Sequence, residues 1–179
     1  PRFLGETFCS IAADILASYG ITPMVIAEAA PTPAISYAVI HEKADGAINF
    51  TASHNPPEYN GIKFSTPDGA PALPEVTRQI EAQIAAEGSA TNGNKATPQS
   101  LDVKATYLAR LREIVDLPAI KKAGLRVAFD PLWGAARGYS DALLRDAGVQ
   151  VETVHDYRDV LFGGHAPEPD DHLLEAMRE

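Results

Sequence analysis

Residues 45–64, "DGAINFTASHNPPEYNGIKF", combine a strand pattern, a polar loop and a second extended stretch. The opening eight residues are a short, mostly apolar run typical of a buried strand. This strand would deliver Ser53 at its carboxyl end, where ligands of α/β sheets gather. Asn60 and Gly61 predict a tight turn, because both residue types tolerate positive φ. The turn would bring Lys63 back towards Ser53.

A serine after a strand is weak evidence of catalysis on its own, because most turn serines hydrogen-bond the nearby backbone. Pro56 and Pro57 restrict the backbone after Ser53, which lowers the entropy lost in fixing the loop. A hydroxyl nucleophile needs a proton acceptor, and phosphoryl transfer needs cations. His54 and Lys63 are residues of these types. The G-x-S-x-G elbow and the Walker pattern are absent, which disfavours acyl transfer and nucleotide hydrolysis.

Strand patterns alternate with helix patterns on both sides of this loop. The expected helices cover residues 8–19, 32 onwards, 73–87, 101–115 and 139–147, and the expected strands include 22–28, 125–130 and 149–154. The alternation predicts an α/β protein with two three-layer α/β/α domains and mixed, largely parallel sheets. Residues 87–100 are rich in Gly, Ser, Thr and Asn and are expected to form a long loop. A domain boundary is expected near residue 117.

Composition narrows the class of protein. The chain has 179 residues, of which 45% are hydrophobic and 22% charged, as in globular proteins. A net charge of -9 without a Lys/Arg run argues against a nucleic-acid partner. No apolar run approaches the ~20 residues of a membrane helix, which argues against a membrane partner. Cys9 is the single cysteine, so no intrachain disulfide can form, in keeping with a cytoplasmic location.

Several stretches together resemble one enzyme family. "TASHNPPEYNGIK" resembles the phosphoserine loop of the alpha-D-phosphohexomutases, the phosphoglucomutase/phosphomannomutase family. "PRFLGETFCSIAADILASYGI" and "PTPA" resemble the family's first helix and the turn after it. "FDPLWGAARGYSDALLRDAGVQV" resembles the opening of its second domain, and "LFGGHAPEPDDHLLEAM" the segment before its metal loop. The resemblance implies domain I over residues 1–117 and domain II over residues 118–179.

The resemblance also implies a mechanism. Ser53 would carry a phosphoryl group and give it to a hexose phosphate, and the bisphosphorylated sugar would reorient and return its other phosphoryl group. Lys63 would act as an acid/base or charge stabiliser, and His54 and Asn55 would shape the phosphoserine environment. Asn55 and Lys63 would also contact the substrate. Mg²⁺ would bind through the phosphate on Ser53, and the partners would be a hexose phosphate and a hexose bisphosphate.

The sequence departs from the family pattern in several places. The family's Asp-Gly-Asp-x-Asp-Arg metal loop, its Glu-Ser-Gly sugar-binding stretch, its final phosphate loop and an arginine-bearing N-terminal segment are absent from this sequence. We therefore expect the chain to be a piece of a longer enzyme, holding most of domain I and much of domain II, and inactive alone. Thr51 favours a phosphoglucomutase or phosphomannomutase over a phosphoglucosamine mutase, whose loop usually has Ser there.

Three alternatives to this interpretation stay open. The chain could be a phosphoglucosamine mutase, a non-catalytic phosphosugar-binding module, or a phosphomonoester hydrolase that uses the same serine with water. Elsewhere, Asp130 follows a strand pattern, and we expect it to stabilise a turn rather than to bind a metal. His155 is expected to be a surface or packing residue, and Trp133 and Tyr139 are expected in the core.

Overall fold

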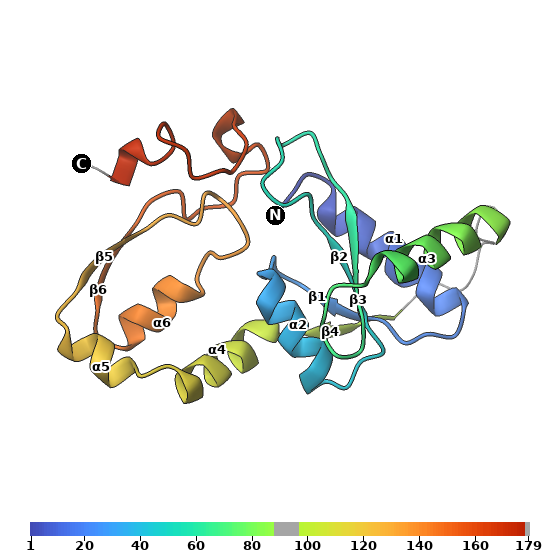
Figure 1. Ribbon diagram of the computed structural model, residues 1–179, viewed down its shortest axis with the longest axis horizontal. Coiled ribbons are helices and arrows are strands. Elements are labelled where there is room, and N and C mark those ends of the chain that lie inside the picture. The colour runs from blue at the N-terminus through green and yellow to red at the C-terminus, as the bar shows by residue number, and fades with distance from the viewer. Residues whose placement is uncertain (88–96, 178–179) are drawn as a thin grey trace.

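The computed structural model describes residues 1–87 and 97–177 and shows an α/β protein (Figure 1). The helices are α1 (Gly5–Ser18), α2 (Thr32–His41), α3 (Pro74–Glu87), α4 (Val103–Ile114), α5 (Leu117–Lys122) and α6 (Ser140–Asp146), followed by the short 3-10 helices η1 (Phe162–Gly164) and η2 (Glu175–Met177). The strands are β1 (Met24–Ile26), β2 (Ala47–Phe50), β3 (Ile62–Ser65), β4 (Gln99–Leu101), β5 (Arg126–Phe129) and β6 (Gln150–Thr153).

The strands form three two-stranded sheets. β1 pairs with β4 and β5 pairs with β6, both in parallel, whereas β2 and β3 are antiparallel. Parallel neighbours require crossover connections, and helices supply them here. The predicted α/β class with mixed, largely parallel sheets is therefore confirmed.

One local prediction needs correction. The loop expected over residues 87–100 gives way to strand β4 at Gln99, because this segment pairs with β1 far along the chain and local composition carries no sign of that partner. Residues 88–96 of the predicted loop lie outside the described residues. Near residue 117, where the domain boundary is expected, the chain forms helix α5, whose first turn is capped by Asp116 accepting the Ala119 N–H. The domain boundary itself stays a prediction.

Helix α1 forms as its periodicity predicts, although few of its side chains are buried. Ala13 is buried, whereas the side chains of Ile11 and Ile15 are 51% and 40% exposed to solvent. The periodic apolar residues therefore predict the helix but not which of its side chains are buried. None of the described helices has the length and apolar character needed to cross a membrane.

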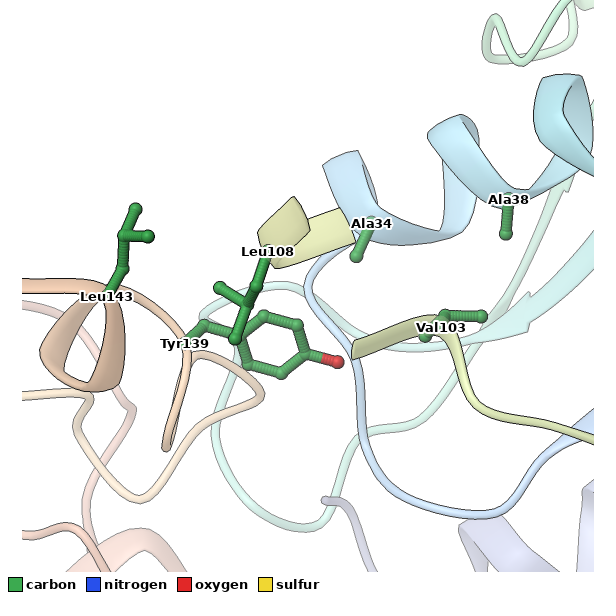
Figure 2. Packing of buried hydrophobic residues seen from close by; sticks show 6 residues of the cluster. All are labelled: Ala34, Ala38, Val103, Leu108, Tyr139 and Leu143. Atoms are coloured by element: carbon green, nitrogen blue, oxygen red, sulfur yellow. The ribbon is translucent and has the colours of Figure 1, made fainter. Parts of the chain in front are cut away.

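The main core lies between α2, α4 and α6. It therefore joins the two parts of the chain that are expected to form separate domains, residues 1–117 and 118–179. Figure 2 shows Leu108 of α4 beside the ring of Tyr139, which precedes α6, and Val103 of α4 on the side of the α2 alanines. The six buried members are Ala34, Ala38, Val103, Leu108, Tyr139 and Leu143. A cap starts α4 at the right place, because the Asp102 carboxylate accepts the N–H groups of Lys104 and Ala105.

A second, smaller core supports the C-terminal segment. It contains Leu132, Trp133, Phe162 and Leu173. The segment that follows β6 runs beside the loop between β2 and β3 (Figure 1); the His54–Glu168 ion pair joins the two, and Arg2 contacts both. This arrangement places residues from both parts of the chain around Ser53.

Candidate functional site

Ser53 lies on the exposed loop, residues 51–61, that connects β2 to β3. Its backbone has φ of 53°, in the left-handed region, and its N–H donates to the Thr51 hydroxyl at 3.2 Å. A non-glycine residue in this region costs on the order of 1–3 kcal/mol and persists only where its surroundings impose it. The loop therefore holds the Ser53 side chain in an imposed orientation.

His54 lies between the Ser53 hydroxyl and a carboxylate from the C-terminal segment. Its Nδ1 is 3.3 Å from Ser53 Oγ, and its Nε2 is 3.4 Å from Glu168 Oε2. With the ring proton on Nε2, the N–H side of the imidazole lies near the Glu168 carboxylate and Nδ1 can accept the serine proton. Both side chains of the His54–Glu168 pair are more than half exposed, so the pair contributes little to stability. Its value is in orienting the ring.

Lys63 is on β3, opposite Asn49 in the antiparallel ladder. Because side chains alternate along paired strands, Lys63 is on the same face of the ribbon as Thr51. Its side chain is exposed and makes no hydrogen bond or ion pair with any described residue. The structure thus brings Ser53 and His54 into contact and leaves the Lys63 ammonium available to an added ligand.

The tight turn expected at Asn60 and Gly61 is wrong. The connection spans the whole 51–61 loop, and neither residue has positive φ. Gly61 is needed for a different reason: its carbonyl accepts the Thr51 N–H at 2.9 Å, and a Cβ there would lie 2.9 Å from the Thr51 oxygen. The Asn60 side chain accepts the Gly61 N–H. Close backbone approach, not left-handed geometry, requires the glycine.

Arg2 is a residue of this site that the sequence did not reveal. Its side chain is buried, with 3% exposure, and its guanidinium donates to loop carbonyls. The acceptors, at distances of 3.5, 3.0, 2.6, 2.9 and 2.8 Å, belong to Ala52, Ser53, Asn55, Pro56 and Tyr59. Burial lowers the pKa of Arg2 from its ordinary value. No local pattern marks an arginine whose partners are 50 to 57 residues away.

A cavity of about 290 Å³ opens beside Ser53 and receives residues from both parts of the chain. Its lining includes Arg2, Thr51 and Ser53 from the first part of the chain, and Asp130 and Phe162 from the loops after β5 and β6. The volume is at the lower limit of small-molecule sites, which span roughly 300–1,000 Å³.

Asp130 fixes one wall of this cavity. Its carboxylate accepts the Leu132 N–H at 2.7 Å and lies 2.8 Å from His155 Nδ1. The His155 ring is tilted against Trp133, with 4.0 Å between the ring centroids. The turn role predicted for Asp130 is confirmed, and His155 is a packing residue that also pairs with a carboxylate. Trp133 and Tyr139 are buried, as predicted.

Comparisons with known proteins agree with this fold. The model of the phosphoglucomutase/phosphomannomutase α/β/α domain I matches residues 1–91, and that of domain II matches residues 105–179. The chain therefore belongs to the phosphoglucomutase/phosphomannomutase family. The predicted family resemblance is thus confirmed.

Individual relatives give the same result. A phosphoglucomutase/phosphomannomutase of Thermococcus kodakarensis is 36% identical over 84% of this chain and 33% of its own length. A phosphoglucosamine mutase of Alkaliphilus oremlandii is 33% identical over 85% of this chain and 32% of its own. A crystal structure from Thermus thermophilus, assigned as a phosphomannomutase, superposes with a TM-score of 0.88 at 34% identity, covering 98% of this chain and 40% of that one. The chain thus spans about a third of the length of these curated relatives.

Proposed function

We propose that this chain carries the phosphoryl-transfer serine of a phosphosugar mutase that interconverts hexose 1-phosphate and hexose 6-phosphate. The observation that carries the proposal is Ser53 itself: an exposed hydroxyl in an imposed left-handed conformation, 3.3 Å from an imidazole. Membership of the family and the names of its relatives support the reaction class. The proposed partners are a hexose phosphate and a hexose bisphosphate.

In the proposed first step, the phosphoryl group on Ser53 Oγ passes to a hydroxyl of the hexose phosphate. The bond between Oγ and phosphorus breaks, a bond from the sugar oxygen to phosphorus forms, and the proton of the sugar hydroxyl ends on Ser53 Oγ. His54 would relay this proton: its Nδ1, 3.3 Å from Oγ, accepts a proton as the neutral imidazole and donates it to the departing Ser53 oxygen as the imidazolium. The second step reverses these changes with the other phosphate of the reoriented sugar, which regenerates phosphorylated Ser53.

Lys63 and Asn55 are proposed as the substrate contacts. The Lys63 ammonium, exposed on the Thr51 face of the ribbon, would neutralise phosphoryl oxygens or exchange a proton with the reacting hydroxyl. The Asn55 side chain is exposed next to the Ser53–His54 pair, where it can donate to a sugar or phosphate oxygen. Positioning and charge stabilisation by such contacts are the main source of catalysis in phosphoryl transfer.

Mg²⁺ is proposed as the cofactor, with the phosphate on Ser53 as a ligand. The described residues do not form a metal site by themselves, because no three His, Cys, Asp or Glu side chains among them are placed to hold an ion. Ser53 fits one coordination position, and the remaining ligands would come from outside the described part of the chain. We therefore assign no catalytic step to the metal. The free thiol of Cys9 accords with the proposed cytoplasmic location.

The proposal covers more than one sugar, because glucose, mannose and glucosamine phosphates are all candidate substrates. Thr51 favours glucose or mannose phosphates, but the relatives include phosphoglucosamine mutases as well. A phosphoglucosamine mutase is accordingly the second candidate. Parallel incubations with the bisphosphates of glucose, mannose and glucosamine would separate the candidates by the rate at which Ser53 gains phosphate.

The test is intact-mass and peptide-mapping analysis of the chain after incubation with glucose 1,6-bisphosphate and Mg²⁺. The parent chain is expected to gain one phosphate on Ser53, and Ser53→Ala none. Ser10→Ala, at an exposed helix position, is the matched control and keeps the uptake. Lys63→Ala is expected to fold normally and to slow the transfer.

Each remaining outcome favours another function. A folded parent chain that gains no phosphate would contradict the carrier role of Ser53 in this chain and favour a non-catalytic phosphosugar-binding module. Steady release of inorganic phosphate, abolished by Ser53→Ala, would favour phosphomonoester hydrolysis. Mutase turnover by the isolated chain would contradict the expectation that it is inactive alone.

A further inference from the structure

The loop that presents Ser53 has little internal support. Its backbone bonds within residues 51–61 include Asn55 N–H to the Ala52 carbonyl and Tyr59 N–H to the Pro56 carbonyl, which are isolated turns rather than a ladder. The Ser53, His54 and Asn55 side chains are exposed, so apolar packing does not fix them. Another group must impose the left-handed backbone of Ser53.

Arg2 is the only described residue whose side chain donates to several carbonyls of this loop. Its two terminal nitrogens make five contacts, which occupy all four of their N–H groups. None of the acceptors is a carboxylate; all are backbone oxygens that bracket Ser53 on both sides. A buried cation costs several kcal/mol unless its donors are satisfied, so the loop and the guanidinium fix each other.

The other face of Arg2 contacts the second part of the chain. Its guanidinium carbon lies 5.1 Å from the centroid of the Phe162 ring, which is 2% exposed. Phe162 is held firmly: its φ is 50°, and a Cβ on Gly163 would meet the Trp133 ring at 2.6 Å. A cation over an aromatic face adds about 0.5–2 kcal/mol, more where water is excluded. Arg2 therefore links the Ser53 loop to the segment after β6.

We propose that Arg2 is the positioning residue of the reactive loop: it holds the backbone of residues 52–59 so that Ser53 is presented for phosphoryl transfer, and it makes that geometry depend on the docking of Phe162. The catalytic consequence rests on the proposed function. The ordering of the loop rests on the contacts alone, and can be tested separately.

Hydrogen exchange resolved by NMR tests the ordering. In Arg2→Ala, the Asn55 and Tyr59 amides are expected to exchange at least about tenfold faster, while amides of the β5–β6 ladder keep their rates. Arg2→Lys keeps the charge but has one nitrogen in place of a planar fork, so it should restore only part of the protection. Arg158→Ala is the matched control, because Arg158 also joins the two parts of the chain, through Glu6 at 2.7 Å, without touching the loop.

The rate of Ser53 phosphorylation by glucose 1,6-bisphosphate tests the consequence. We expect it to fall at least about tenfold in Arg2→Ala, because small losses of geometry weaken transfer strongly, and to recover in part when free guanidinium is added. Arg158→Ala should match the parent. Rescue by guanidinium would not follow from a general loss of stability.

Either of two results would overturn the proposal. The first is that the Asn55 and Tyr59 amides of Arg2→Ala exchange at rates within about twofold of those of the parent, and the second is that Arg158→Ala accelerates the exchange of these amides equally. If Arg2→Ala does not fold, the same exchange and phosphorylation rates are compared between Arg2→Lys and the parent. If the parent itself gains no phosphate, the proposed function fails, whereas hydrogen exchange still decides the role of Arg2.

Discussion

Left-handed backbone conformations concentrate around the cavity beside the reactive loop and a neighbouring cavity. Ser53, Leu132 and Phe162 have positive φ and line the cavity beside the reactive loop. Trp133 and His155 also have positive φ and line the neighbouring cavity. Each of these non-glycine residues is disfavoured there by roughly 1–3 kcal/mol. Tertiary contacts at these positions therefore override local preference, as is common at functional sites.

Gly61→Ala tests the close approach that closes the loop. The added Cβ would lie 2.9 Å from the Thr51 carbonyl oxygen, a backbone atom that cannot move without breaking the Thr51–Gly61 hydrogen bond. We expect a loss of about 1–3 kcal/mol in the free energy of unfolding, measured by urea denaturation. Gly5→Ala is the control, because nothing lies within 4 Å of its Cβ position and Ala favours helix α1. Equal stability of both variants would refute the steric account.

For single residues, the sequence predicts which residue types can react better than it predicts which residues lie together at the site. Ser53, His54 and Lys63 could be selected by residue type, and the contact between Ser53 and His54 follows from their adjacency. Arg2 and Glu168 could not be selected, because their roles depend on partners distant in the chain. Charge burial and cross-chain pairing exist only once the elements have packed, so no local pattern carries them.

At the scale of elements, the loops after β5 and β6 are joined by one buried carboxylate. The Asp130 side chain is 2% exposed and serves both the Leu132 N–H and His155. Asp130→Ala leaves a buried N–H and the imidazole unpaired, and should cost about 2–4 kcal/mol in the free energy of unfolding.

A comparison of two aspartates isolates this effect. Asp102→Ala removes the exposed cap of α4 and should cost only about 1 kcal/mol. Asp130→Asn keeps an acceptor for Leu132 and should fall between the two alanine variants. Chemical denaturation of the three proteins checks the order, and a loss for Asp130→Ala no greater than that for Asp102→Ala would contradict it.

Tyr139 makes the main core sensitive to alkaline pH. Burial, followed by nearby acidic groups including Asp102 and Glu28, raises the pKa of Tyr139 from 10.0 to about 12. The folded chain thus keeps this proton at a pH where the unfolded chain loses it. Its contribution to stability is complete below pH 10.0 and is lost as the pH rises towards about 12.

Thermal denaturation between pH 9 and pH 12 measures this contribution. Tyr139→Phe lacks the ionisable group, so its melting temperature should fall less steeply over that window than that of the parent. Tyr59→Phe is the control, because the Tyr59 side chain is 55% exposed, and it should keep the slope of the parent. Identical slopes for the parent and Tyr139→Phe would contradict the stabilising contribution of the protonated Tyr139 hydroxyl.

Periodicity predicted most elements because their patterns are local. Helix α2, with prolines at its start, and strand β2, an apolar run, form where expected. Strand β4 was missed because its three residues, from Gln99 to Leu101, carry no alternation, and their extended form is imposed by β1. The buried side chains of α1 could not be predicted for a related reason, because burial depends on the neighbouring elements and not on the helix itself.

For the whole molecule, one core joins the two parts of the chain that the family models divide. α2 belongs to the part matched by domain I, whereas most of α4 and all of α6 belong to the part matched by domain II. Leu108 on α4 packs in a cluster with Ala34 of α2 and Leu143 of α6 (Figure 2). Unfolding of either part should therefore expose the core that both parts share, and the chain should unfold in a single transition.

Leu108→Ala tests this coupling by calorimetry. Removing a buried leucine side chain, 8% exposed in the parent, should cost about 2–5 kcal/mol and lower the temperature of the whole transition. Leu125→Ala is the control, since Leu125 is 50% exposed and should shift the midpoint little. Two resolved transitions, with only one displaced by Leu108→Ala, would show that the parts unfold independently. A single displaced transition would show that the cluster makes them one cooperative unit, which is the condition for Phe162 in one part to control Ser53 in the other through Arg2.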